Sequence, residues 1–152
     1  MDNQLLEAKL SQLLHILRET AEWLGVPGET FCRETKLVRA CQRNLQLLVE
    51  YASDINGILI LEFGKKAPGS YRESFSSVFD MDFASTLSAT DRDELLASVD
   101  WRNDLIHEYE PEQSSETFYR VLKEFLVAYR NYAQLIHGRF LSPNSIFLTD
   151  RP

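Results

Sequence analysis

A repeating pattern of apolar residues between positions 29 and 64 constrains the fold of this chain more than any other feature of its sequence. Successive members of the repeat are three or four residues apart, which is the spacing of one face of an α-helix. Such a pattern favours near-antiparallel helix packing, within a bundle or across a dimer. The repeat consists of Val38, Cys41, Leu45, Leu48, Ala52, Ile55 and Leu59. It predicts one very long helix over residues 29–64, about 50 Å in length, which a second protomer could help to cover.

The remaining segments are also predicted to be helical, because Gly and Pro are few and helix-forming residues dominate. Ser70 and Glu73 have the spacing of a capping box, which marks the first turn of a helix. The predicted helices cover residues 3–24, residues 29–64, a short segment after Ser70, the segment from Thr90 to Pro111, and residues 114–139. We therefore expect an all-α antiparallel bundle of about five helices with a very long second helix. It would form one domain of residues 1–140, followed by a tail of residues 141–152.

The net charge of −7 limits the partners that this chain can bind. Neutralisation of phosphates supplies most of the non-specific affinity of proteins for nucleic acids, so the charge argues against a general nucleic-acid binder. A local basic surface is still compatible with it, since Arg33, Lys36, Arg39 and Arg43 fall at helical spacing on one flank of the long predicted helix. We interpret this flank either as an ordinary solvated helix face or as a basic wall beside an RNA cleft.

The cysteines and the apolar runs indicate the cellular compartment. Cys32 and Cys41 are nine residues apart in a predicted helix, which separates them by about 13 Å and is too far for a disulfide. The first four residues are polar, unlike a signal peptide, and the apolar run of residues 58–61 is too short to span a bilayer. We therefore expect a reduced, cytoplasmic protein that does not enter a membrane.

The stretch from Trp101 to Tyr109 carries the side chains best suited to chemistry. Arg102 can bind a phosphate through two parallel hydrogen bonds, and His107 can exchange protons near neutral pH. Together they suffice to cleave RNA, whose own 2′-hydroxyl is the nucleophile, so we expect neither a metal nor a cofactor. The three scattered histidines and two distant cysteines also offer no predicted metal-ligand cluster.

Helix geometry does not by itself bring Arg102 and His107 together. They are five positions apart, so they point about 140° apart around an ideal helix, whereas Asn103 and His107 are neighbours on one face. Either the helix unwinds near Glu108, or the long arginine side chain reaches around, or two copies of the motif face each other across a dimer. The dimer would also supply two imidazoles, one as base and one as acid.

The spacing Arg102-x4-His107-x-Tyr109, with Asn103 directly after the arginine, resembles the motif of HEPN-domain ribonucleases. More narrowly, it resembles the HepT toxins encoded beside a minimal nucleotidyltransferase (MNT) antitoxin, in toxin–antitoxin systems of type II or VII. Residues 36–40 and residues 68–75 also resemble HepT segments, in the same order along the chain. The resemblance spans most of residues 30–135.

This resemblance implies a HEPN-like helical fold and a metal-independent endoribonuclease toxin that cleaves tRNA or mRNA in the cleft of a homodimer, which can join a larger toxin–antitoxin assembly. It implies catalytic roles for Arg102 on the scissile phosphate, for His107 in proton transfer, and for Asn103 in orienting His107 or binding substrate. It also implies that the MNT antitoxin transfers AMP to Tyr109, where the added charge and bulk would repel RNA.

Two other functions are compatible with the same sequence. The first is a non-catalytic HEPN module that binds a nucleotide or a nucleotidyltransferase partner, and the net negative charge favours it. The second is a purely structural dimerisation bundle. The presence of Arg102, Asn103 and His107 together favours the ribonuclease.

Overall fold

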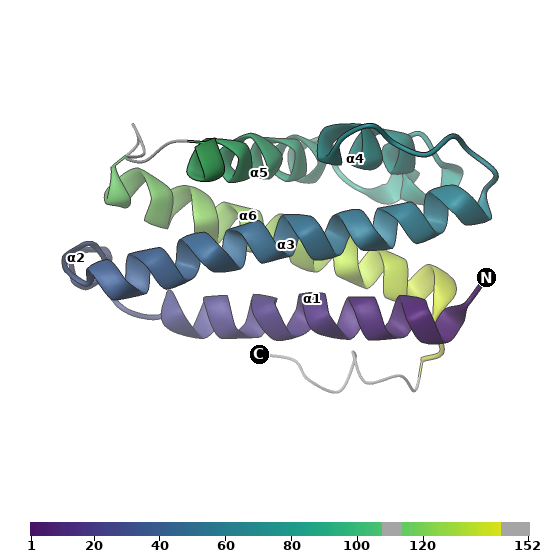
Figure 1. The fold of residues 1–152 in the computed structure, drawn as a ribbon. Helices are drawn as coiled ribbons and strands as arrows, with labels where there is room; N and C mark the ends of the chain where they lie inside the picture. The colour runs from purple at the N-terminus through teal and green to yellow at the C-terminus, as the bar shows by residue number, and fades with distance from the viewer. Residues whose placement is uncertain (108–113, 144–152) are drawn as a thin grey trace.

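The fold is a bundle of long helices with shorter helices near its ends (Figure 1). The computed structural model describes residues 1–107 and 114–143, and of His107 the backbone alone. The elements in these residues are α1 (Asn3–Trp23), α2 (Gly28–Arg33), α3 (Thr35–Glu62), α4 (Tyr71–Phe79), the 3₁₀ helix η1 (Asp82–Thr86), α5 (Ala89–His107) and α6 (Ser115–Phe140). The all-α expectation is confirmed, although the described residues form six α-helices and the longest is third in order rather than second.

The four long helices pack with their neighbours running in opposite directions. α1 and α3 lie side by side and antiparallel, as do α5 and α6 (Figure 1). α6 also packs against α1, and α5 contacts both α3 and α4. This is the arrangement that three-four spacing favours.

The heptad repeat of α3 forms the centre of the core. All of its members are buried, with exposed fractions between 0% and 7%. Asn56 interrupts the apolar pattern but is fully buried as well, because its amide donates a hydrogen bond to Ser74 at 3.2 Å and its carbonyl accepts one from the Tyr132 hydroxyl at 2.5 Å. Buried polar groups are tolerated when they are paired in this way, and these bonds join α3 to α4 and α6. None of the described helices is long and apolar enough to cross a bilayer.

The prediction of a single helix over residues 29–64 is wrong near its start. At Glu34 the backbone leaves the helical conformation, with φ −101° and ψ 88°, and this break separates α2 from α3. α2 places the ring of Phe31 against Phe118 and Tyr119 of α6, with ring centroids 6.3 and 5.1 Å apart, and the ring is fully buried. Burial of the Phe31 ring is energetically favourable, so it stabilises a chain that breaks at Glu34 over one continuous helix.

Both cysteines are free, as expected, but the break places Cys32 in α2 and Cys41 in α3. Burial raises the pKa of the Cys41 thiol to about 11, and the nearby charge of Glu19 acts in the same direction. Cys41 therefore remains protonated at neutral pH and behaves as a small apolar core residue. Residues 144–152 of the predicted tail lie outside the described part of the chain.

Candidate functional site

The site is built on the second half of α5, which is anchored at its start and along its buried face. The Ser88 hydroxyl accepts a hydrogen bond from the Asp91 amide at 3.0 Å, so the helix begins one residue before the predicted Thr90. Leu95 and Val99 are buried, at 0% and 2% exposure. Together these contacts determine which face of α5 turns outward at Arg102.

Arg102 is held by residues from three helices. Its guanidinium carbon lies 4.6 Å from the centre of the Tyr71 ring in α4, and Nη2 lies 3.8 Å from Oε1 of Glu50 in α3. Within α5, Nη1 donates a hydrogen bond to Oδ1 of Asn103 at 3.1 Å. The side chain is only 16% exposed. A guanidinium that is stacked, paired and hydrogen-bonded in this way has little rotamer freedom left to lose when it binds a ligand.

The position of Tyr71 follows from the cap of its helix. The Ser70 hydroxyl accepts a hydrogen bond from the Glu73 amide at 3.1 Å, which confirms the predicted helix start. The Glu73 carboxylate accepts a bond from the Gly69 amide at 2.7 Å, one residue before the position that a capping box uses. Tyr71 is the first residue of α4, so this cap presents its ring to Arg102.

Arg102 retains unused hydrogen-bonding capacity. Its Nε is buried and has no hydrogen-bond partner within the described residues. A buried cationic donor without a partner is costly. Because this atom is buried, a phosphate oxygen could reach it only after a movement of the Arg102 side chain, whereas the exposed part of the guanidinium can bind phosphate oxygens directly. The geometry is therefore suited to hold one phosphate against α5.

The structure brings some of the predicted site residues together. Arg102 and Asn103 are hydrogen-bonded to each other. α5 remains helical as far as His107, where only the backbone is described, and Tyr109 and Pro111 lie outside the described residues. The helix therefore does not unwind before His107. Arg102 extends towards α3 and α4. Glu108 lies outside the described residues, so unwinding near Glu108, a reach around the helix and a pairing of two protomers all remain as ways to bring the guanidinium and imidazole together.

Sequence reasoning missed two residues of this site, Glu50 and Tyr71. Nothing in the sequence indicated that Glu50 belongs to the site, because an acidic residue on the flank of a helix is common. Tyr71 lies in the segment of residues 68–75 that resembles HepT, but that resemblance did not indicate a contact with Arg102.

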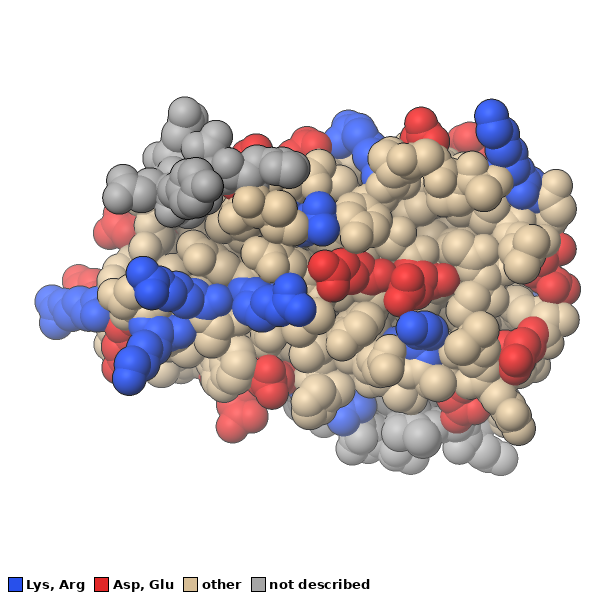
Figure 2. Space-filling model, in the orientation of Figure 1, with Lys and Arg blue, Asp and Glu red and all other residues tan. Residues whose placement is uncertain are grey.

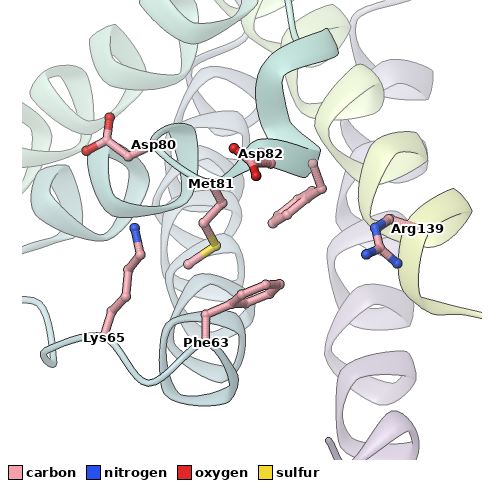
Figure 3. A pocket seen from close by; sticks show the side chains of 7 residues that line it. Phe63, Lys65, Asp80, Met81, Asp82 and Arg139 are labelled. Carbon is pink, nitrogen blue, oxygen red and sulfur yellow. The ribbon is translucent and has the colours of Figure 1, made fainter.

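A cavity lies away from Arg102, where α3 ends (Figure 3). Its volume is about 530 Å³. Its lining residues are Phe63, Lys65, Asp80, Met81, Asp82, Phe83 and Arg139. Two cations and two carboxylates balance each other there, and no predicted site residue takes part.

Comparison with known proteins identifies a family and a fold. The sequence model of the family described as "Ribonuclease HepT-like" matches residues 13–136. A solved structure of a mutant MntA-HpeT toxin-antitoxin is similar over 90% of this chain and 99% of its own, with 20% identity and a TM-score of 0.75. A structure of a toxin-antitoxin with AMP-PNP covers the same shares, with 19% identity and a TM-score of 0.77. These structures show the same fold. No curated protein matches the sequence significantly.

Proposed function

Because the chain belongs to the HepT-like ribonuclease family, we propose that it is the toxin of a toxin–antitoxin system and a metal-independent endoribonuclease of the cytoplasm. The observation that carries this proposal is the placement of Arg102, whose mostly buried guanidinium is stacked on Tyr71 and paired with Glu50. Such a group is ready to bind a phosphodiester.

In the proposed reaction, the 2′-oxygen of RNA attacks the adjacent phosphorus while the bond to the 5′-oxygen breaks. One His107 takes the proton of the 2′-hydroxyl, and a second imidazole gives a proton to the leaving oxygen. Arg102 binds the phosphate and stabilises the charge that builds up on its oxygens. Asn103, which accepts a hydrogen bond from Arg102, keeps the guanidinium oriented.

The need for two imidazoles supports a homodimer as the active form, because each chain supplies one His107. The RNA cleft would then form where two copies of α5 meet.

The direct test is incubation of the purified protein with tRNA and with mRNA, with and without a chelator. We expect cleavage at equal rates in both conditions, since the RNA supplies the nucleophile and Arg102 supplies the charge. If cleavage stops on addition of chelator and returns with a divalent cation, the metal-independent mechanism is wrong.

We further propose that a nucleotidyltransferase antitoxin inactivates the toxin by transferring AMP to Tyr109. The comparison structures are toxin-antitoxins, and one contains AMP-PNP, a nucleotide analogue. An added phosphodiester two residues after His107 would bring negative charge to a site that must accept RNA.

Replacing Tyr109 with phenylalanine should abolish this modification while leaving the toxin active, because phenylalanine lacks the hydroxyl that accepts AMP. Intact-mass measurement after incubation with antitoxin and ATP should show added AMP on the unmodified toxin and none on Tyr109→Phe. Tyr51→Phe is the matched control and should still gain AMP. Added mass that persists in Tyr109→Phe would place the modification elsewhere.

One observation favours the second function, a non-catalytic module that binds a nucleotide or a nucleotidyltransferase. The net charge of −7 is unusual for a protein that acts on a polyanion. Such a module would bind the nucleotidyltransferase without cleaving RNA, so the cleavage assay separates the two functions.

A further inference from the structure

Three exposed basic residues form one stripe on the first part of α3. Lys36, Arg39 and Arg43 are all exposed, and at 100° per residue their positions fall within about 60° around the helix axis. They cover about 10 Å along that axis. Figure 2 shows the row of basic side chains along this part of α3, and acidic side chains farther along the helix.

The stripe is not neutralised by neighbouring carboxylates. Some basic side chains elsewhere on the described surface have acidic partners, such as Lys9 with Asp54 at 3.1 Å and Arg72 with Asp100 at 3.2 Å. Within the described residues, Lys36 and Arg39 have neither an ion pair nor a hydrogen bond, and Arg43 donates only to the neutral Gln46. Three adjacent uncompensated cations on a chain of net charge −7 create a local attraction for a polyanion.

The stripe continues to the candidate site. Glu50 follows Arg43 by seven positions, so it lies about 10 Å farther along the same side of α3. Its carboxylate is the group that contacts Arg102, at 3.8 Å. The row of uncompensated cations ends at this point, since the next exposed residue on the same side is Asp54, which pairs with Lys9. A polyanion on the stripe would therefore be attracted as far as Arg102 and no farther.

We propose that Lys36, Arg39 and Arg43 bind the sugar–phosphate backbone of single-stranded RNA and lead it to Arg102. A single row of cations on one helix can follow one backbone, whereas an RNA duplex presents two backbones across a groove. The end of the row of cations near Glu50 sets the direction in which the strand approaches. This inference rests on the proposed ribonuclease function for what happens at Arg102, but binding to the stripe does not require cleavage.

The test compares two triple variants that carry equal charge. Lys36→Gln/Arg39→Gln/Arg43→Gln removes the stripe, and Lys65→Gln/Lys66→Gln/Arg139→Gln removes three exposed cations elsewhere. Two of these, Lys65 and Arg139, line the cavity of Figure 3, where α3 ends. Each variant changes the net charge from −7 to −10. Both are made in a His107→Ala background, so that the RNA stays intact, and circular dichroism verifies that they fold. Fluorescence anisotropy then measures binding of labelled oligo-uridine over a range of salt concentrations.

We expect the stripe variant to bind at least tenfold more weakly at low salt, and the control variant to bind as its His107→Ala parent does. In a plot of log affinity against log salt concentration, the slope for the stripe variant should be smaller in magnitude by about 2. Each phosphate contact to a single strand contributes about 0.7 to this slope, and the variant loses three such contacts. If the two triple variants lose equal amounts of RNA affinity, net charge alone would explain the loss, and the inference would be overturned. Absence of RNA binding by the parent would overturn it as well.

Two further measurements separate this inference from the proposed function. If the wild-type chain binds oligo-uridine through the stripe but cleaves no RNA, the ribonuclease proposal fails and the binding surface stands. If the stripe variant, with His107 restored, cleaves RNA at the wild-type rate but no longer binds the antitoxin, the stripe is a surface for an acidic protein and the RNA inference is wrong.

Discussion

Replacement of Arg102 with alanine is expected to lower the rate of RNA cleavage by about 10²–10³-fold, the usual effect of removing one group that stabilises transition-state charge. The guanidinium is already held by Tyr71 and Glu50, so it needs little reorganisation to bind the phosphate. The measurement is single-turnover cleavage of a labelled single-stranded RNA. The bundle should keep its helical content, because the ion pair to Glu50 is long and partly solvated and such pairs contribute little stability.

Arg72→Ala is the matched control for this experiment. Arg72 is exposed and pairs with Asp100 at 3.2 Å, so its loss changes the net charge by the same amount without touching Arg102. We expect its cleavage rate to stay near that of the wild type. Arg102→Lys should remain slow, because lysine lacks the planar group that stacks on Tyr71 and binds phosphate through two parallel bonds. Equal cleavage rates for Arg102→Ala and Arg72→Ala would show that Arg102 takes no part in the reaction.

Replacement of His107 with alanine should lower the cleavage rate by about 10²–10⁴-fold, which is the usual contribution of general acid–base catalysis. Substrate affinity should remain, since Arg102 and the stripe on α3 are unchanged. The measurement is again single-turnover cleavage, with RNA binding followed separately. A His107→Ala variant that cleaves as fast as the wild type would end the proposed mechanism.

Mixed dimers test whether both imidazoles are needed in one cleft. When wild-type and His107→Ala chains are co-expressed in equal amounts, about a quarter of the dimers keep two wild-type chains. If one cleft uses both imidazoles, the activity per total protein should fall to about that fraction. A fall to one half would mean that each chain works independently, and the shared cleft would then be wrong.

The local part of the fold could be predicted from the sequence. The repeat of α3 identified the buried face of that helix, and every residue of the repeat is buried. The capping pattern at Ser70 located the start of α4. The prediction failed at Glu34, where no proline or glycine marks the break between α2 and α3. The break instead accompanies the burial of Phe31 against α6, a contact between distant segments that a local pattern does not report.

For the candidate site, too, the sequence predicted the local features and the tertiary structure decided the contacts between distant segments. The sequence by itself determined that Arg102 and Asn103 lie on one helix and which reactive side chains are available, because helical spacing and side-chain chemistry are local properties. Only the tertiary structure decided what surrounds Arg102. Packing of α5 against α3 and α4 brought Glu50 and Tyr71 to the guanidinium, since contacts between distant segments depend on how whole helices pack rather than on the spacing within any one of them.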